Sequence, residues 1–340
     1  MRLPETIVEL AGVGAGAAAL SYGAGWVVFV ALAKWRMLDV PNARSSHWRP
    51  TPRGGGLGIM ATFLGATALL AAVTGVWTAW LVCGTVGGLA FVSFWDDRVA
   101  LSWRVRLGGH LVAAALGALW LRPDTGAASW WLVPLLVLLL AGHANAFNFM
   151  DGINGLAGGQ AVVAALGLAV LAVGREGAVV HPAGVLAVVL AGAAAGFLPH
   201  NFPRARMFMG DVGSVPIGFA LMLLSAWLAR DRGLSAWVPL LAIQSGFILD
   251  AGLTLARRWW RGESVQEAHR EHFYQRLVRS GWTHPAATGS FLAVSSGVSA
   301  AALALAWSDR APGWTIAVSV TAWGVYFGIC EAIFRAKHRN

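Results

Sequence analysis

Long apolar stretches alternate with short polar connections along the whole chain. A helix needs about 20 mostly apolar residues to cross the hydrocarbon layer of a membrane. Eleven stretches approach this length, at residues 11–33, 57–76, 79–95, 107–121, 130–148, 156–173, 182–198, 213–229, 236–256, 288–307 and 313–334. The pattern predicts an all-α polytopic membrane bundle of about 11 transmembrane helices. No linker or internal repeat divides it, so we expect a single integral-membrane domain over residues 1–340.

The composition excludes a soluble protein. Hydrophobic residues make up 57% of the 340 residues and charged residues only 12%, about half of the ~25% typical of soluble domains. So little charge cannot cover a surface that faces water, which also excludes a disordered chain and a soluble nucleic-acid binder; we expect no nucleic-acid partner. The 18 Trp and 42 Gly fit closely packed helices with aromatic belts at the membrane interfaces.

The basic residues are distributed unequally between the two sides of the predicted bundle. Of the 25 Lys and Arg, 19 lie in one alternate set of connections, at residues 34–56, 96–106, 149–155, 199–212, 257–287 and 335–340. The other set holds the remaining six. Connections rich in Lys and Arg stay in the cytoplasm. The sequence therefore predicts an N-terminus outside and a C-terminus in the cytoplasm.

Polar residues suited to chemistry occur only in the connections predicted to be cytoplasmic. They form five patches, at residues 39–56, 95–98, 145–155, 208–214 and 269–276. The opposite connections are short and resemble simple turns. Because the five patches share one membrane face, we expect a single site assembled from several loops.

Four carboxylates of these patches suggest a metal site. Asp96 and Asp97 are adjacent and would project about 100° apart on a helix, while Asp151 and Asp211 each lie beside a glycine. Four negative charges on one face of a chain poor in charge repel one another unless a cation is present. A hard divalent ion with oxygen ligands is the expected cofactor, Mg²⁺ first with Mn²⁺ as a substitute.

Basic and glycine-rich segments suggest an anionic substrate. The turn at residues 51–56 follows Arg53 with three glycines, a composition that suits anion binding by backbone N–H groups. The histidines His269 and His272 suit donation to phosphate or sugar better than zinc binding, because no further ligand completes a zinc set. Asp250 precedes Arg257 and Arg258 by seven and eight residues, and we expect it to be a buried structural carboxylate in an ion pair.

With these motifs in order, the chain resembles the polyprenyl-phosphate N-acetylhexosamine-1-phosphate transferase family, in the branch that starts O-antigen synthesis. The resemblance rests on the segments PTPRGGG (50–56), DD (96–97), NAFNFMDG (145–152), FMGDVGS (208–214) and HREH (269–272). It implies a bacterial inner-membrane enzyme that moves a sugar 1-phosphate from a UDP-sugar to undecaprenyl phosphate and releases UMP. This reaction is the first step of lipid-linked synthesis of an envelope polysaccharide such as lipopolysaccharide.

The resemblance also implies roles for individual residues. Asp211 and Asn148 correspond to metal ligands, and Asp96 or Asp97 to the group that positions or deprotonates the lipid phosphate. Phe208 corresponds to the residue that stacks on uracil and Asn154 to one that hydrogen-bonds the base. The other implied substrate-binding residues are Arg53, Arg106, Asp151, His269, Arg270 and His272.

Two alternatives stay open at this stage. A lipid I synthase of the same family is disfavoured because its run of consecutive histidines is absent from residues 269–272. A secondary transporter of a phosphorylated solute would need polar residues near the middle of the bilayer, whereas here they crowd one interface. The sequence names neither the sugar nor the oligomeric state, and a homodimer is one option.

Overall fold

The computed structural model of the protein describes residues 7–41, 49–122, 130–173, 180–264, 269–308 and 312–338. Residues 42–48, in the first polar patch, therefore lie outside the description. The described helices are α1 (Ile7–Trp35), α2 (Gly56–Thr74), α3 (Trp77–Val99), α4 (Trp103–Leu121), α5 (Leu132–Phe149), α6 (Leu156–Ala172), α7 (Pro182–Asn201), α8 (Asp211–Arg232), η2 (Leu234–Ala236), α9 (Trp237–Trp260), α10 (Phe273–Arg279), α11 (His284–Trp307) and α12 (Pro312–Lys337). Strands β1 (Leu38–Asp39) and β2 (Thr51–Pro52) form a short antiparallel pair.

The predicted all-α bundle is confirmed, since each of the eleven apolar stretches is a helix. In the described part of the chain, nine helices are long and apolar enough to cross a membrane by length and composition. Of the other two, α6 has 17 residues and α4 begins with Arg104 and Arg106 in its first turn. The short helix α10 lies within the fifth polar patch and was not among the predicted spans.

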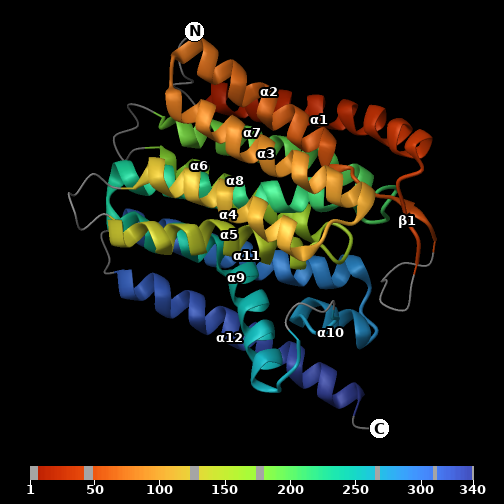
Figure 1. The fold of residues 1–340 in the computed structure, drawn as a ribbon. Helices are drawn as coiled ribbons and strands as arrows, with labels where there is room; N and C mark the ends of the chain where they lie inside the picture. Colours follow the sequence, from red (N-terminus) through yellow and green to blue (C-terminus); the bar gives the residue numbers. More distant parts are fainter. Residues whose placement is uncertain are drawn as a thin grey trace.

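Helix α8 forms the centre of the bundle. The long helices lie side by side, and α9 crosses their direction steeply toward α10 and α12 (Figure 1). The apolar stretch of α8 is completely buried, and α8 packs against α2, α3, α5 and α7. A helix that is apolar on all sides lies in a protein core or in lipid, and the neighbours of α8 place it in the core of the bundle. The outer helices instead expose large apolar side chains such as Leu69, Phe91 and Leu138, as lipid-facing helices do.

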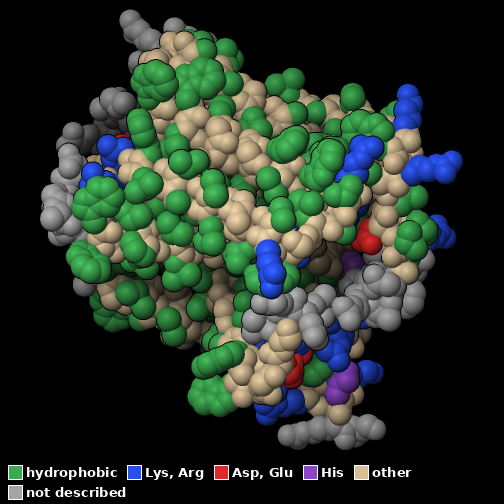
Figure 2. Space-filling view, in the orientation of Figure 1, with side chains coloured by type: hydrophobic (Ala, Val, Ile, Leu, Met, Phe, Trp, Pro, Cys, Tyr) green, Lys and Arg blue, Asp and Glu red, His purple; other side chains and the backbone are tan. Residues whose placement is uncertain are grey.

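The two ends of the bundle differ in chemistry. Hydrophobic side chains cover most of the visible face, while Lys, Arg and His gather mainly at the end with β1 and around α10 (Figure 2). Charged groups in a membrane protein lie at the interfaces because burying them in hydrocarbon is costly. This distribution matches a bundle that spans the membrane with one strongly basic end.

The glycine-rich turn after Arg53 joins two loops instead of binding an anion. The N–H groups of Gly54 and Gly55 donate to the Phe208 carbonyl at 3.2 and 2.8 Å, and that of Gly56 donates to the Met209 carbonyl at 2.8 Å. The expectation that these N–H groups bind an anion is therefore wrong. Backbone donors in a partly buried turn need partners, and the 208–209 segment supplies them. The turn thus docks the start of α2 onto the loop that leads into α8.

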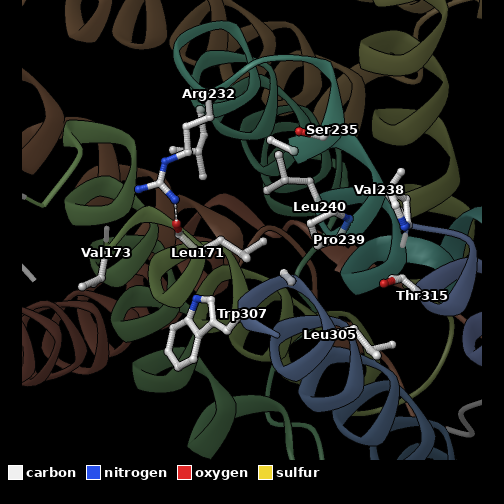
Figure 3. A pocket seen from close by; sticks show the side chains of 14 residues that line it. Leu171, Val173, Arg232, Ser235, Val238, Pro239, Leu240, Leu305, Trp307 and Thr315 are labelled. Atoms are coloured by element: carbon white, nitrogen blue, oxygen red, sulfur yellow. Dashed lines mark hydrogen bonds between the residues drawn. The ribbon is translucent and has the colours of Figure 1, made fainter. Parts of the chain in front are cut away.

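A cavity of about 400 Å³ lies at the opposite end, between α6, α8, α9, α11 and α12. The Arg232 guanidinium points at the end of α6 and donates to the carbonyls of Leu171 and Ala172 (Figure 3). Carbonyls at a helix C-terminus lack partners within the helix, and a basic side chain satisfies them. Among its described lining residues there is no carboxylate or histidine. This cavity lacks the groups that the sequence predicted for the site.

We expect Gly56→Ala to lower the free energy of unfolding by about 1–3 kcal/mol, the usual cost of overpacking. A Cβ on Gly56 would overlap the backbone of Gly213, at the first turn of α8. Gly84→Ala is the matched control, because a Cβ there meets nothing within 4 Å and alanine favours the helix. Thermal unfolding of both variants in detergent measures the difference. Equal midpoints would contradict the tight approach of α2 to α8.

Candidate active site

The predicted single site exists as a cavity of about 420 Å³ at the basic end of the bundle. Helices α3, α4, α5 and α8 and the segment that leads into α10 all contribute to its wall. The lining residues with charged, imidazole or amide side chains are Asp96, Arg106, His110, Asn145, Asn148, Asp211, His269, His272 and Gln275. Side chains more than 170 residues apart in sequence thus meet at one place, and four of the five predicted polar patches contribute to it, whereas no described residue of 39–56 lines the cavity.

Arg53 joins two of the four carboxylates. Its Nε lies 2.9 Å from Asp97 Oδ1 and its Nη2 lies 2.5 Å from Asp211 Oδ1. Burial by itself would lower the pKa of the Arg53 guanidinium, but the charges of Asp211 and Asp97 outweigh burial and raise its pKa. A planar guanidinium can serve two carboxylates at once because its N–H groups diverge in fixed directions. Arg53 therefore holds the ends of α3 and α8 together.

Asp97 caps helix α8 from a distant part of the chain. Its two oxygens accept from the backbone N–H groups of Asp211 and Val212, at 3.1 and 2.9 Å. The residue before α8 is Gly210, which has no side chain to act as a cap. The N-terminal N–H groups of a helix lack internal partners and carry partial positive charge, so a carboxylate there is favourable. The Asp97 side chain has no exposed surface and does not line the cavity.

Asp96 has the opposite environment, although it is the adjacent residue. One oxygen accepts from the Leu101 N–H at 2.7 Å and the other lies 3.2 Å from Arg106 Nη1. Asp96 lines the cavity and its carboxyl is within hydrogen-bonding reach of that of Asp211. The same Arg106 nitrogen lies 3.8 Å from Asp211 Oδ2. The structure therefore separates the aspartate pair into a cavity-facing group and a helix cap.

Asp211 and Asn148, with Asp96 beside them, could hold a hard cation through their side-chain oxygens. All three side chains line the same cavity, and Asn148 Oδ1 is oriented by the Ser214 hydroxyl, which donates to it at 2.8 Å. Two carboxylates this close are a natural position for a cation. Among the described residues no three His, Cys, Asp or Glu side chains cluster as a metal site. A set with few protein ligands suits Mg²⁺, which keeps water and substrate phosphate among its ligands.

The histidines of the fifth patch form the wall opposite α3 and α4. The His272 ring is near-parallel to those of Phe149 and Tyr274, with centroids 6.2 and 5.9 Å away, and lies 4.9 Å from the His269 ring. Burial, followed by the positive fields of His272 and Arg258, lowers the pKa of His269 to about 4. His269 is therefore neutral near pH 7.

Asp250 is buried, as expected, but its expected ion pair with Arg257 or Arg258 is wrong. Asp250 Oδ1 lies 3.0 Å from His272 Nδ1. Arg257 and Arg258 instead pair with Glu331 at 3.5 Å and Glu271 at 2.8 Å. Spacing along α9 suggested the arginines, whereas the fold of the following segment brings a histidine to the carboxylate.

Six predicted site residues are not in the described lining of the cavity: Arg53, Asp97, Asp151, Asn154, Phe208 and Arg270. Burial raises the pKa of Asp151 well above its ordinary value; the charge of Arg53 opposes this rise, and those of Asp211 and Asp97 add to it. The Asn154 side-chain amide donates to the Pro203 carbonyl at 3.1 Å. Phe208 pairs with Arg53 through the backbone, and the Arg270 carbonyl accepts from Arg279 at 3.1 Å.

Three cavity residues were missed as individual candidates: His110, Asn145 and Gln275. His110 and Asn145 face each other at the cavity, where the Asn145 amide lies 3.0 Å from His110 Nδ1. His110 is one helical turn after Arg106, and Asn145 is three residues before Asn148, so each shares a helix face with a predicted residue. That spacing was the available signal.

A multi-pass helical bundle with carboxylates, arginines and histidines around one interfacial cavity defines a membrane enzyme for anionic substrates. The family model for glycosyl transferase family 4 matches residues 77–229, from the start of α3 nearly to the end of α8. This range contains Asp96, Asp97, Asn145, Asn148 and Asp211. The chain belongs to this family of transferases, as the relatives described next also show.

The relatives extend the match beyond that segment. A decaprenyl-phosphate N-acetylglucosaminephosphotransferase of Mycolicibacterium smegmatis is 35% identical over 313 residues, which cover 81% of this chain and 77% of the relative. A probable undecaprenyl-phosphate N-acetylglucosaminyl 1-phosphate transferase of Bacillus subtilis is 30% identical, covering 73% and 71%. A phospho-N-acetylmuramoyl-pentapeptide-transferase of a Synechococcus species is 28% identical, covering 90% and 92%.

The separation of the aspartate pair predicts different stabilities for two similar variants. Asp97→Asn removes the charge that caps α8 and pairs with Arg53, so we expect a loss of about 1–2 kcal/mol, the scale of a helix cap with its dipole interaction. Asp96→Asn, the matched control, affects a group that faces the cavity and should cost less. Thermal unfolding in detergent compares the two. A larger loss in Asp96→Asn would refute the assignment of Asp97 as the cap.

Proposed function

We propose that the protein transfers an N-acetylhexosamine 1-phosphate from a UDP-sugar to a polyprenyl phosphate and releases UMP. The observation that carries the proposal is the cavity in which Asp96, Asp211 and Asn148 face Arg106 at one end of a membrane bundle. The relatives of Mycolicibacterium smegmatis and Bacillus subtilis, named as N-acetylglucosamine phosphotransferases of decaprenyl and undecaprenyl phosphate, support it. For this chain we propose undecaprenyl phosphate as the acceptor and an envelope polysaccharide, such as O-antigen, as the pathway.

The chemistry is one displacement at phosphorus. Asp96 accepts the proton of the lipid phosphate or orients it, and an oxygen of that phosphate attacks the β-phosphorus of the UDP-sugar. The new bond joins the lipid phosphate to the β-phosphorus, while the bond to the α-phosphate oxygen breaks and UMP leaves. One phosphoanhydride replaces another, so the reaction is readily reversible. Positioning and electrostatic stabilisation supply most of the rate in phosphoryl transfer.

The basic side chains hold the charges of the substrates. Arg106 lies between Asp96 and Asp211, where it would contact the phosphates, and Arg53 supports Asp211 from the other side. Asp211 and Asn148 would hold Mg²⁺, or Mn²⁺ in its place, which leaves Asp96 for the lipid phosphate. That ion would neutralise the diphosphate and the charge that develops on the leaving phosphate.

The remaining predicted residues are proposed to bind the donor. His269, Arg270 and His272 would contact the sugar, while Phe208 and Asn154 would contact the uracil and Asp151 the adjoining part of the donor. This assignment follows the family resemblance. The proximity of Phe208 to Arg53 through their backbone pairing supports a donor site that extends from the cavity toward the 208–210 loop.

The rival hypothesis, a secondary transporter, has less support. Alternating access needs a substrate site near the middle of the bilayer with a path to each side. The middle of α8 is instead filled by buried apolar side chains such as Ile217, Phe219 and Leu221. The cavity lined by Asp96 and Asp211 lies at the start of α8, and the cavity of Figure 3 lies at its end, beyond this apolar layer.

Isotope exchange tests the proposed reaction against transport. Purified protein, Mg²⁺ and unlabelled lipid-diphosphate sugar should incorporate radiolabelled UMP into UDP-sugar, because the reverse barrier is comparable to the forward one. A panel of UDP-sugars in the forward direction, with mass spectrometry of the lipid product, identifies the sugar. No exchange, with label crossing sealed vesicles instead, would favour the transporter. Exchange without lipid would indicate a covalent enzyme intermediate and exclude single displacement.

Asp96→Asn and Asp211→Asn should each lower kcat of the exchange by at least about 10²-fold, the scale of losing a proton acceptor or a preorganised charge. EDTA should abolish exchange by the wild type. Asp231→Asn is the matched control, since this carboxylate lies at the opposite end of the bundle beside His181. Wild-type rates in Asp211→Asn would remove the proposed metal ligand.

We also propose an inner-membrane location with the cavity in the cytoplasm, the N-terminus outside and the C-terminus inside. Ser264→Cys, next to the α10 segment, should react with a membrane-impermeant maleimide only from the cytoplasmic side. Ser308→Cys, which follows α11 and is likewise exposed, should react only from outside. Labelling in intact and opened cells measures both. The reverse pattern would invert the topology and place the cavity outside.

A further inference from the structure

We infer that Asp250 is a positioning residue for donor binding, acting through His272. Resting on the proposed function, the inference assigns to Asp250 the task of holding the His272 ring with Nε2 toward the donor's diphosphate and sugar. Asp250 does not line the cavity, whereas His272 does. The two residues come from α9 and from the segment that begins α10, 22 positions apart.

The contacts of Asp250 define the orientation of the ring. One carboxylate oxygen accepts from His272 Nδ1 at 3.0 Å and from the Phe273 N–H at 3.1 Å, and the other accepts from the Tyr274 N–H at 3.4 Å. The Asp250 side chain is fully buried. An ionised carboxylate only accepts hydrogen bonds, so the partner nitrogen Nδ1 must carry a proton. Nε2 is then the nitrogen left to meet the substrate, as in other sites where a carboxylate selects the tautomer of a histidine.

The ring plane is restricted as well. Phe149 and Tyr274 stack on His272 with interplanar angles of 26° and 14°. The His272 side chain is only 3% exposed. With the side chain almost fully buried and Nδ1 held by Asp250, the Nε2 edge is the one left to reach the cavity. A group oriented before the substrate arrives loses little entropy on binding.

A second imidazole extends this edge. His269 lies 4.9 Å from His272, and its buried Nδ1 has no hydrogen-bond partner among the described residues. A buried polar atom without a partner is costly unless a ligand or water satisfies it. The charged groups near the pair are Asp250, Arg258, Glu263 and Glu271 on their own side and Asp96, Arg106 and Asp211 in the rest of the cavity lining. The polar sugar and diphosphate of a UDP-sugar supply the complementary groups.

The position of His269 and His272 in the cavity indicates that they contact the UDP-sugar and not the lipid phosphate. The apolar lining residues Val92, Trp103 and Leu107 come from α3 and α4, and Trp103 and Leu107 are partly exposed on the bundle surface. A prenyl chain would approach along such a surface. The histidine wall lies in the polar segment around α10, which faces water in the proposed topology.

Other contacts hold the α10 segment independently of Asp250. Arg276 pairs with Glu331 of α12, Arg258 with Glu271 at 2.8 Å, and Phe273 stacks on Phe327 at 4.3 Å. Removing the charge at position 250 therefore leaves the segment attached to α9 and α12. The loss should fall on the orientation of His272.

Forward transfer kinetics with UDP-N-acetylglucosamine and undecaprenyl phosphate test the inference. In Asp250→Asn, the side-chain amide can donate an N–H to His272 Nδ1. The His272 tautomer with its proton on Nδ1 is then no longer favoured. We expect the KM for the UDP-sugar to rise about 10- to 100-fold, the scale of one hydrogen bond to a charged group, with the KM for the lipid unchanged. His272→Gln should raise the same KM, and the double variant should be no worse than His272→Gln alone.

Asp231→Asn is the matched control, because it removes the charge of another Asp–His pair, at 2.8 Å from His181, far from the cavity. A merely structural role for Asp250 would lower kcat or yield and leave both KM values unchanged, which would overturn the inference. Additive losses in the double variant would do the same. If Asp250→Asn does not fold, His272→Gln decides by itself: a KM for the UDP-sugar equal to that of the wild type overturns the inference. Wild-type protein without any transfer activity would instead refute the proposed function.

Discussion

The site depends on the junction at which Arg53, Asp97 and the first turn of α8 meet. Asp97 satisfies two N–H groups of that turn, and Arg53 balances Asp97 while also holding Asp211. Removing Asp97 leaves the buried N-terminus of α8 and the Arg53 charge without a partner, which destabilises the junction. The position of Asp211, the first residue of α8, follows from this junction.

Close packing around α8 makes the junction possible. Gly56 and Gly213 let the starts of α2 and α8 approach until their backbones touch, and the N–H groups of the 54–56 turn bind the carbonyls of Phe208 and Met209. Small residues at helix contacts serve this purpose in membrane bundles, where apolar surfaces gain little by leaving lipid. The buried body of α8 then fixes the depth at which the polar cavity begins.

The segment around α10 is built on a different principle. It is short and polar, and an ion-pair network of Arg257, Arg258, Arg276, Glu271 and Glu331 holds it to α9 and α12. The carboxylate side of the cavity is formed instead by α3, α5 and α8. In the proposed function, the carboxylate side would carry the phosphoryl transfer and the α10 side would contact the sugar.

The sequence by itself determined the eleven helices, the basic end and the set of polar segments that form one site. These features depend on local composition, because an apolar stretch must satisfy its own backbone hydrogen bonds in lipid. Only the tertiary structure distinguished Asp96 from Asp97, gave the glycine-turn N–H groups to Phe208 and Met209, and joined Asp250 to His272. Each of these depends on a partner elsewhere in the chain, 114 residues away for Asp97 and Asp211. Helix packing brings such partners together, and the pattern around either residue carries no record of them.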